Sequence, residues 1–394
     1  MEDAGIVESK RSGFVNMLLF LASTHFILHV YTMLLPALLP TLRSELGVSL
    51  PQVSLLVSIP LLVQIVANIP AGVASDRYGG AVMAASFLAN VAAAALIPAS
   101  TNFLTLLIGF CLLAIGSALY HPPGLKASSE VDPSRMNLAL GAHIAAGSMG
   151  IAVGPIVLGL LMPIWGWRSS FYLWMPPTLM FAVVSYLYMG RSSTTAIVEP
   201  GPRAGDGLRS LLTADFLLVL LFCALVEASF LNFSTFIPTY FTEVRGIPPS
   251  LTSIIFGLGP LVGIAGAFGG GAAGDRYGRL MVTSVLLFVI SALLALVPLS
   301  PGVMVSAAVY IIVRALFASS MPLLSAMIAA NSGVGNRSLA FSAYFAVLNL
   351  AGAATTSATS LIVEAHGASM MFPISIAILV PAMGLILLLK HRSA

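Results

Sequence analysis

The stretch Gly72-Val-Ala-Ser-Asp-Arg-Tyr-Gly79 occurs almost unchanged a second time, as Gly271-Ala-Ala-Gly-Asp-Arg-Tyr-Gly278, 199 residues further along the chain. Each copy lies between two long apolar runs, and the spacing is half of the 394-residue chain. Two copies of one hydrophobic module, each marked at the same internal turn, predict a duplicated helical membrane protein with its working site between the halves.

The composition supports a membrane protein. Only 8% of the residues are charged and 58% are hydrophobic, with a mean hydropathy of +1.01. A soluble domain normally carries about 25% charged residues, so this chain cannot cover an apolar core with a charged surface. Its apolar runs have the roughly 20 residues needed to cross about 30 Å of hydrocarbon. They are too long and too uniformly apolar for the strands of a membrane barrel.

The hydropathy pattern predicts an all-α integral membrane protein with twelve transmembrane helices in two six-helix bundles. We expect an N-terminal bundle over residues 1–190, a polar linker over 191–212 and a C-terminal bundle over 213–394. The twelve expected helices cover residues 14–41, 50–72, 80–98, 103–123, 136–163, 169–190, 213–241, 249–273, 280–298, 303–330, 337–364 and 369–389.

The basic residues predict the orientation. With the N-terminus inside, thirteen Lys and Arg residues face the cytoplasm, and only Arg43, Arg168 and Arg245 face outward. The first apolar run is too long for a signal-peptide core, so we expect it to be retained. These features predict a multi-pass protein of the inner (plasma) membrane with both termini in the cytoplasm. The net charge of +3 then reflects topology and gives no indication of nucleic-acid binding.

The duplicated stretch resembles a cassette of the major facilitator superfamily. Gly-x-x-x-Asp-Arg-x-Gly follows the second and the eighth predicted helices, as it does in that family, where the cassette is a cytoplasmic hinge and lock. Gly80 stands where the family usually has a basic residue, whereas Arg279 keeps it, so we expect a weaker lock in the first half. The residues that the resemblance assigns to the lock are Gly72, Asp76, Arg77, Gly79, Gly271, Asp275, Arg276, Gly278 and Arg279.

Two further resemblances concern the direction of transport. The pattern in the fifth predicted helix is similar to the glycine-proline motif of proton-driven drug antiporters; its residues are Gly141, Gly150, Gly154, Pro155 and Gly159. The stretches 23–26 and 116–122 resemble the fosmidomycin-resistance branch of efflux proteins, although His29 stands where that branch tends to carry an acidic residue. These resemblances imply export.

Ionisable residues inside the apolar runs are candidates for function, because a charged group at mid-membrane costs several kcal/mol. His25 and His29 lie one turn apart on the first helix, Glu227 lies on the seventh and Arg314 on the tenth. The family resemblance places helices one, four, seven and ten around the central cavity. Tyr31, Phe230 and Tyr310 are candidate aromatic residues of the same cavity.

Several roles are open to these groups. Arg314 can hold an anionic substrate while Glu227 carries a proton, or the two can form a purely structural ion pair. His25 and His29 are the alternative proton carriers, or they serve packing and hydrogen bonding. His121, expected at a cytoplasmic helix end, and His143 are weaker candidates. Cys111 and Cys223 lie in different halves without ligand spacing, so no metal site or disulfide is predicted.

The sequence predicts a secondary transporter that moves a small organic molecule by alternating access, in the form of proton-coupled efflux. The alternative within transport is symport, the proton-coupled uptake of an organic anion bound by Arg314. An integral-membrane enzyme or a channel is a further alternative, but the sequence shows neither a catalytic cluster nor a filter-like segment. No Gly-x-x-x-x-Gly-Lys-Ser/Thr loop for ATP occurs. We expect a monomer without a cofactor, whose partners are the substrate, protons and the lipid bilayer.

Overall fold

The computed structural model describes residues 2–132, 135–189, 211, 213–332 and 337–393. Within these ranges the side chains of residues 2–12, 76, 137, 338 and 391–393 are not described. Every regular element in the described ranges is a helix, as the hydropathy pattern predicted.

The first half of the chain contains six labelled α-helices. They are α1 (Glu2–His29), α2 (Leu34–Leu46), α3 (Leu50–Ala99), α4 (Phe103–Glu130), α5 (Met136–Trp165) and α6 (Ser169–Met189).

The second half contains six α-helices and three short helical turns. They are α8 (Ala214–Thr239), η2 (Tyr240–Val244), α9 (Pro249–Tyr277), α10 (Arg279–Leu296), η3 (Val297–Leu299), α11 (Gly302–Asn331), α12 (Arg337–His366), η4 (Ala368–Met370) and α13 (Met371–Ser393).

The described residues contain 12 segments long and apolar enough to cross a membrane, which confirms the predicted number. The first of these, Gly13–Leu46, is not one continuous helix, because residues 30–33 form a turn between α1 and α2. His29 is the last residue of α1 and lies directly before this break. Broken helices in transporters commonly place polar side chains at membrane depth, since neighbouring groups satisfy the freed backbone atoms.

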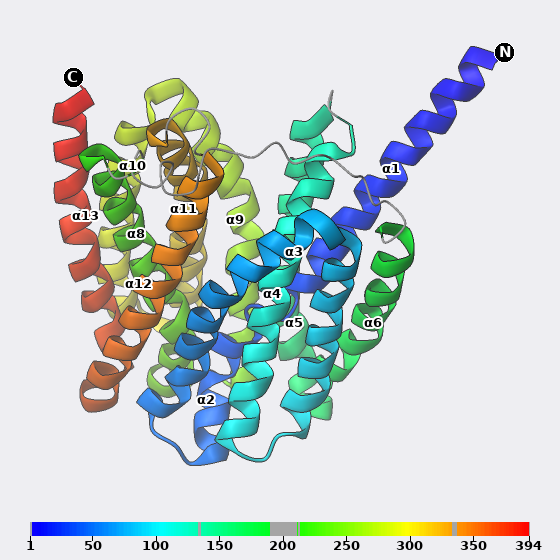
Figure 1. The fold of residues 1–394 in the computed structure, drawn as a ribbon. Helices are drawn as coiled ribbons and strands as arrows, with labels where there is room; N and C mark the ends of the chain where they lie inside the picture. Colours follow the sequence, from blue (N-terminus) through cyan, green and yellow to red (C-terminus); the bar gives the residue numbers. More distant parts are fainter. Residues whose placement is uncertain (1, 133–134, 190–210, 212, 333–336, 394) are drawn as a thin grey trace. The chain divides into compact units, whose positions relative to one another are not determined.

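The chain separates by its contacts into two compact units, and each contains residues from more than one stretch of sequence. One unit consists of residues 1–35 and 66–195, and the other of residues 36–65 and 196–394. In the second unit α8 packs against α12 and α13, which lie beside it in Figure 1. The predicted linker over 191–212 falls almost wholly outside the described residues, so the domain boundaries at 190 and 213 stay a prediction.

Glycines allow two helix pairs to pack with their backbones in contact. On α5, a Cβ atom at Gly150 would collide with the carbonyl oxygen of Phe26 on α1, and one at Gly154 with that of Val30. On α9, Gly266 and Gly270 press in the same way against the backbone of α11. Small residues suit such interfaces, because in lipid the association of helices depends on close packing.

Candidate functional site

Arg314 lies on α11 and is buried, with 6% of its surface exposed. Its guanidinium carbon lies 4.4 Å from the centroid of the Phe230 ring, and its buried Nε atom makes no hydrogen bond. Gly259 on α9 makes room for this side chain, since a Cβ atom there would lie 2.8 Å from Arg314 Cγ. A buried cation with an unused donor is costly unless an anion or another acceptor reaches it.

Glu227 lies on α8 one turn before Phe230, so the carboxyl group and the ring share one face of the helix. The side chain is partly buried. The hydroxyl of Tyr344 on α12 lies within hydrogen-bonding range of its carboxyl group, and Tyr344 itself is buried. Arg314 is near enough to interact electrostatically with this carboxylate.

Glu227 and Arg314, both described, do not form an ion pair within 4.0 Å. The structural ion pair that the sequence left open is therefore not present in this conformation. The arginine instead lies on an aromatic ring, and the glutamate meets a tyrosine. The two ionisable groups lie near each other in the second unit, and Arg314 keeps its Nε donor unpaired.

The three candidate aromatic residues have different positions. Phe230 is partly buried beneath the guanidinium of Arg314. Tyr310 is fully buried, and its hydroxyl donates a hydrogen bond of 2.7 Å to the Phe256 carbonyl oxygen. Tyr31 lies in the other unit, also buried, with its hydroxyl 2.9 Å from Thr178 Oγ1. Tyr31 thus serves helix packing in this conformation, whereas Phe230 and Tyr310 both lie against Arg314.

His25 and His29 meet across one turn of α1, as their spacing predicted. Their Nε2 atoms lie 3.0 Å apart. The Nδ1–H group of His25 donates to the carbonyl oxygen of His143 at 2.7 Å, and Nδ1 of His29 lies 2.9 Å from Thr32 Oγ1. The ring of His143, on α5, stacks on that of His25 with the centroids 3.9 Å apart. The two candidates for proton transfer therefore belong to a larger group of histidines.

His121 does not lie at a helix end, which corrects the sequence analysis. Helix α4 continues through Pro122 and Pro123 to Glu130, so His121 lies inside the membrane-spanning segment Phe103–Glu130. Prolines are tolerated within membrane helices because neighbouring groups can satisfy the freed carbonyl oxygens. The ring of His121 lies 5.5 Å from that of His29, measured between centroids.

The two copies of the duplicated cassette have different backbones. In the first, α3 continues through the cassette with a kink at Tyr78, whose φ is −133° and ψ is 35°. In the second, α9 ends and Gly278 adopts a φ of +88°, which favours glycine. Arg279 then donates a hydrogen bond of 2.9 Å to the carbonyl oxygen of Ala326 on α11. Gly80 cannot make the matching bond.

The remaining lock and motif residues are surface or packing positions. Arg77 and Arg276 each lie over the tyrosine that follows them, at 5.4 Å and 5.1 Å from the ring centroids. Of the acidic pair, the side chain of Asp76 lies outside the described residues, and that of Asp275 is exposed. A Cβ atom would meet either open space or ordinary van der Waals contacts at four of the glycines, namely Gly72, Gly79, Gly141 and Gly271. Pro155 and Gly159 are buried on α5.

An ion-pair network that the sequence analysis missed lies within the second unit. Arg43 on α2 contacts Glu243 of η2 and Glu364 on α12, each at 2.9 Å. Glu364 also accepts the backbone N–H of Leu50 at the start of α3, at 3.0 Å. The partners lie about 200 and 320 residues from Arg43 in the sequence, and no local spacing links positions so far apart.

Curated proteins that resemble this chain are transporters and resistance proteins. It is 30% identical over 136 residues to the probable L-galactonate transporter of Escherichia coli (strain K12), covering 33% of this chain and 29% of that protein. It is 32% identical over 164 residues to the methyl viologen resistance protein SmvA of Salmonella typhimurium (strain 14028s / SGSC 2262), covering 39% and 32%. The chain thus spans about a third of the length of these relatives.

The fold and the family follow from two broader comparisons. A bacterial homologue of the human lysosomal transporter Spinster, solved in an inward-facing and unoccupied conformation, superposes with a TM-score of 0.80 at 15% identity. The match covers 95% of this chain and 96% of that one, which shows a shared fold. The profile of the Major Facilitator Superfamily matches residues 20–356. The chain is therefore a member of the Major Facilitator Superfamily, a multi-pass membrane protein with 12 membrane-competent segments among its described residues.

Proposed function

We propose that this transporter couples the movement of a small organic molecule to a proton gradient, with Glu227 as the proton carrier and Arg314 as the substrate anchor. The observation that carries this proposal is the arrangement of these two groups: they lie in one neighbourhood without an ion pair. A nearby cation favours the ionised form of a carboxyl group. When the cation binds an anionic partner this effect weakens, so the carboxyl group can take up a proton, and it can release the proton when the partner leaves.

Export is the leading direction. Its support comes from the helix-five motif, whose Gly150 and Gly154 lie directly against α1. A proton that moves inward through Glu227 would then drive the substrate outward. Resistance proteins such as SmvA are among the relatives of this chain, in agreement with this direction.

Uptake of an organic anion is the second candidate, and a specific observation favours it. The buried guanidinium of Arg314 keeps an unpaired Nε donor, which suits the planar carboxylate of a substrate. A probable L-galactonate transporter, whose name specifies a carboxylate, is also among the relatives. Both candidates use the same two residues and an inward-moving proton, and they differ in the direction in which the substrate moves.

The test reconstitutes the protein in liposomes that contain a pH-sensitive dye. Panels of small carboxylates and of cationic drugs are added under proton gradients of each sign. The proposal predicts proton flux that depends on one class of compound and on the protein. Compound-driven flux that is equal in protein-free liposomes, or substrate movement without any proton flux, would contradict it.

A further inference from the structure

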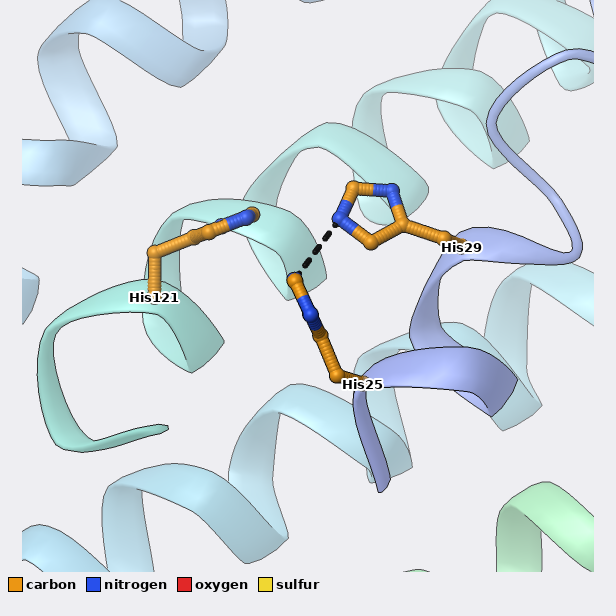
Figure 2. Close-up of side chains that lie close together, drawn as sticks. All are labelled: His25, His29 and His121. Carbon is orange, nitrogen blue, oxygen red and sulfur yellow. Dashed lines mark hydrogen bonds between the residues drawn. The ribbon is translucent and has the colours of Figure 1, made fainter. Parts of the chain in front are cut away.

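His25, His29 and His121 form a compact group within the first unit. One ring nitrogen from each residue lies within 4.8 Å of the other two, and the Nε2 atoms of His25 and His29 are 3.0 Å apart. Figure 2 shows His121 reaching from α4 toward the pair on α1. Two helices that are far apart in the sequence, α1 and α4, thus present three imidazoles to one point.

The outer ring nitrogens of these histidines are held by oxygen atoms. Nδ1–H of His25 donates to the His143 carbonyl oxygen, and Nδ1–H of His121 donates to the Ser117 carbonyl oxygen, each at 2.7 Å. Because a carbonyl oxygen only accepts, both of these neutral rings carry their lone pair on Nε2. Nδ1 of His29 lies 2.9 Å from the hydroxyl of Thr32, which can accept or donate.

This hydrogen-bond pattern is the one found around metal-bound histidines. A ligating imidazole commonly donates its outer N–H to a carbonyl or another oxygen, which fixes the ring and leaves the inner nitrogen free for the metal. At present His29 satisfies the lone pair of His25 through a hydrogen bond. In that arrangement His29 carries its proton on Nε2; a shift of the proton to Nδ1, with rotation of the Thr32 hydroxyl to accept it, would let His29 supply a third lone pair.

We propose that His25, His29 and His121 form a binding site for a divalent late transition metal ion such as Zn²⁺. Imidazole nitrogens suit Zn, Cu and Ni, whereas Mg²⁺ and Ca²⁺ require oxygen ligands. Tetrahedral zinc with nitrogen ligands at 2.0–2.1 Å places those nitrogens about 3.3 Å apart. The 3.0 Å between the His25 and His29 Nε2 atoms is close to this value, and the His121 nitrogen, within 4.8 Å of both, would move inward to reach it.

The surrounding helices fix the rings in place. A Cβ atom at Gly147 would lie 2.5 Å from Cε1 of His25, so the ring occupies space that only glycine leaves free. His29 and His121 are partly buried, which keeps one side of the group accessible to an ion. His143 adds a fourth buried imidazole beside His25, and neither of its ring nitrogens makes a well-directed hydrogen bond. In a tetrahedral site the fourth ligand of the ion would be water or an anion.

The test is zinc binding to the full chain, purified without a polyhistidine tag and held in lipid nanodiscs. Equilibrium dialysis against Zn²⁺ alone measures stoichiometry and affinity. We expect one ion per chain, and a loss of affinity of at least about tenfold in His25→Gln, His29→Gln and His121→Gln, since even outer-shell changes cost this much. His366→Gln at the exposed end of α12 is the matched control and is expected to bind as the unaltered protein does.

A second measurement does not depend on how the variants fold. Co²⁺ bound to the unaltered protein is expected to give the intense visible absorption of a tetrahedral site, and X-ray absorption is expected to show imidazole nitrogen ligands. Zinc binding that persists in all three glutamine variants would overturn the proposal. So would the absence of specific binding at millimolar Zn²⁺, or a Co²⁺ spectrum of an octahedral aquo ion.

Discussion

The guanidinium carbon of Arg314 lies 4.4 Å from the centroid of the Phe230 ring, and Phe230 follows Glu227 by one helical turn. This contact orients a buried cation beside a carboxyl group without pairing the two. The ring supplies part of the electrostatic stabilisation that a counter-ion would otherwise provide, at about 1–2 kcal/mol for a desolvated cation on an aromatic face. In the function we propose, the arginine then binds the substrate with donors that no carboxylate of the described residues occupies.

Replacing Arg314 with lysine is expected to weaken substrate binding by about tenfold or more. The change keeps the charge but removes the planar group that stacks on Phe230 and binds a carboxylate with two parallel hydrogen bonds. Binding is measured by titrating the transported compound into nanodisc-embedded protein. The control is Arg337→Lys at the exposed start of α12. Equal affinity in the Arg314 variant and the control would remove Arg314 from the binding site.

The glycines of helix five are expected to differ sharply in their tolerance of alanine. Gly154→Ala forces a Cβ atom into the backbone at Val30, in the turn that directly follows α1, so we expect a loss of about 1–3 kcal/mol in unfolding free energy. Gly141→Ala has open space around its Cβ atom and is expected to be neutral or to stabilise by up to about 1 kcal/mol. Thermal unfolding in detergent measures both. A Gly154 variant as stable as the Gly141 variant would show that α1 and α5 do not pack so closely.

The two copies of the duplicated cassette provide a second matched pair. Gly278 has a φ of +88°, so alanine there is expected to cost about 1–2 kcal/mol through left-handed backbone strain. At Gly79 the φ is negative and the nearest atom to a Cβ would be 3.8 Å away, so alanine is expected to be tolerated. Unfolding temperatures of the two variants are compared. Equal destabilisation would contradict the asymmetry of the two turns.

The Arg43–Glu364 contact is expected to contribute a small, salt-dependent coupling energy. Both side chains are about a third exposed, and such pairs contribute about 0.2–1 kcal/mol. The double-mutant cycle of Arg43→Gln and Glu364→Gln isolates the term that belongs to the pair. Unfolding in detergent at low and high salt is the measurement. A coupling energy of zero at low salt would show that the Arg43–Glu364 pair does not stabilise the folded protein.

The sequence predicts the helices well and the side-chain neighbourhoods poorly. Span number and position follow from length and hydropathy, because about 20 apolar residues are needed to cross the bilayer. The meeting of His25 with His29 follows from their spacing on one helix. The sequence analysis missed the break after His29. Residues 30–33 contain no glycine or proline, the residues that usually indicate the end of a helix.

The other contacts of the candidate sites depend on packing between distant helices. His121 approaches His25 and His29 only because α1 lies against both α4 and α5. Tyr344 meets Glu227 across more than a hundred residues of sequence. Glu227 and Arg314 are recognisable as rare charges in apolar helices. Whether they form an ion pair depends on side-chain conformation, which a hydropathy pattern does not report.

Proton-driven transport by Glu227→Gln tests the central claim most directly. The amide keeps the size of the side chain and part of its hydrogen bonding, but it cannot release a proton. Liposomes with an imposed proton gradient are used to measure accumulation of the identified substrate, with Glu130→Gln at the exposed end of α4 as control. We expect the Glu227 variant to lose accumulation against a gradient while it still exchanges substrate at equilibrium, and the control to keep both. Accumulation by Glu227→Gln at the unaltered rate would contradict the account.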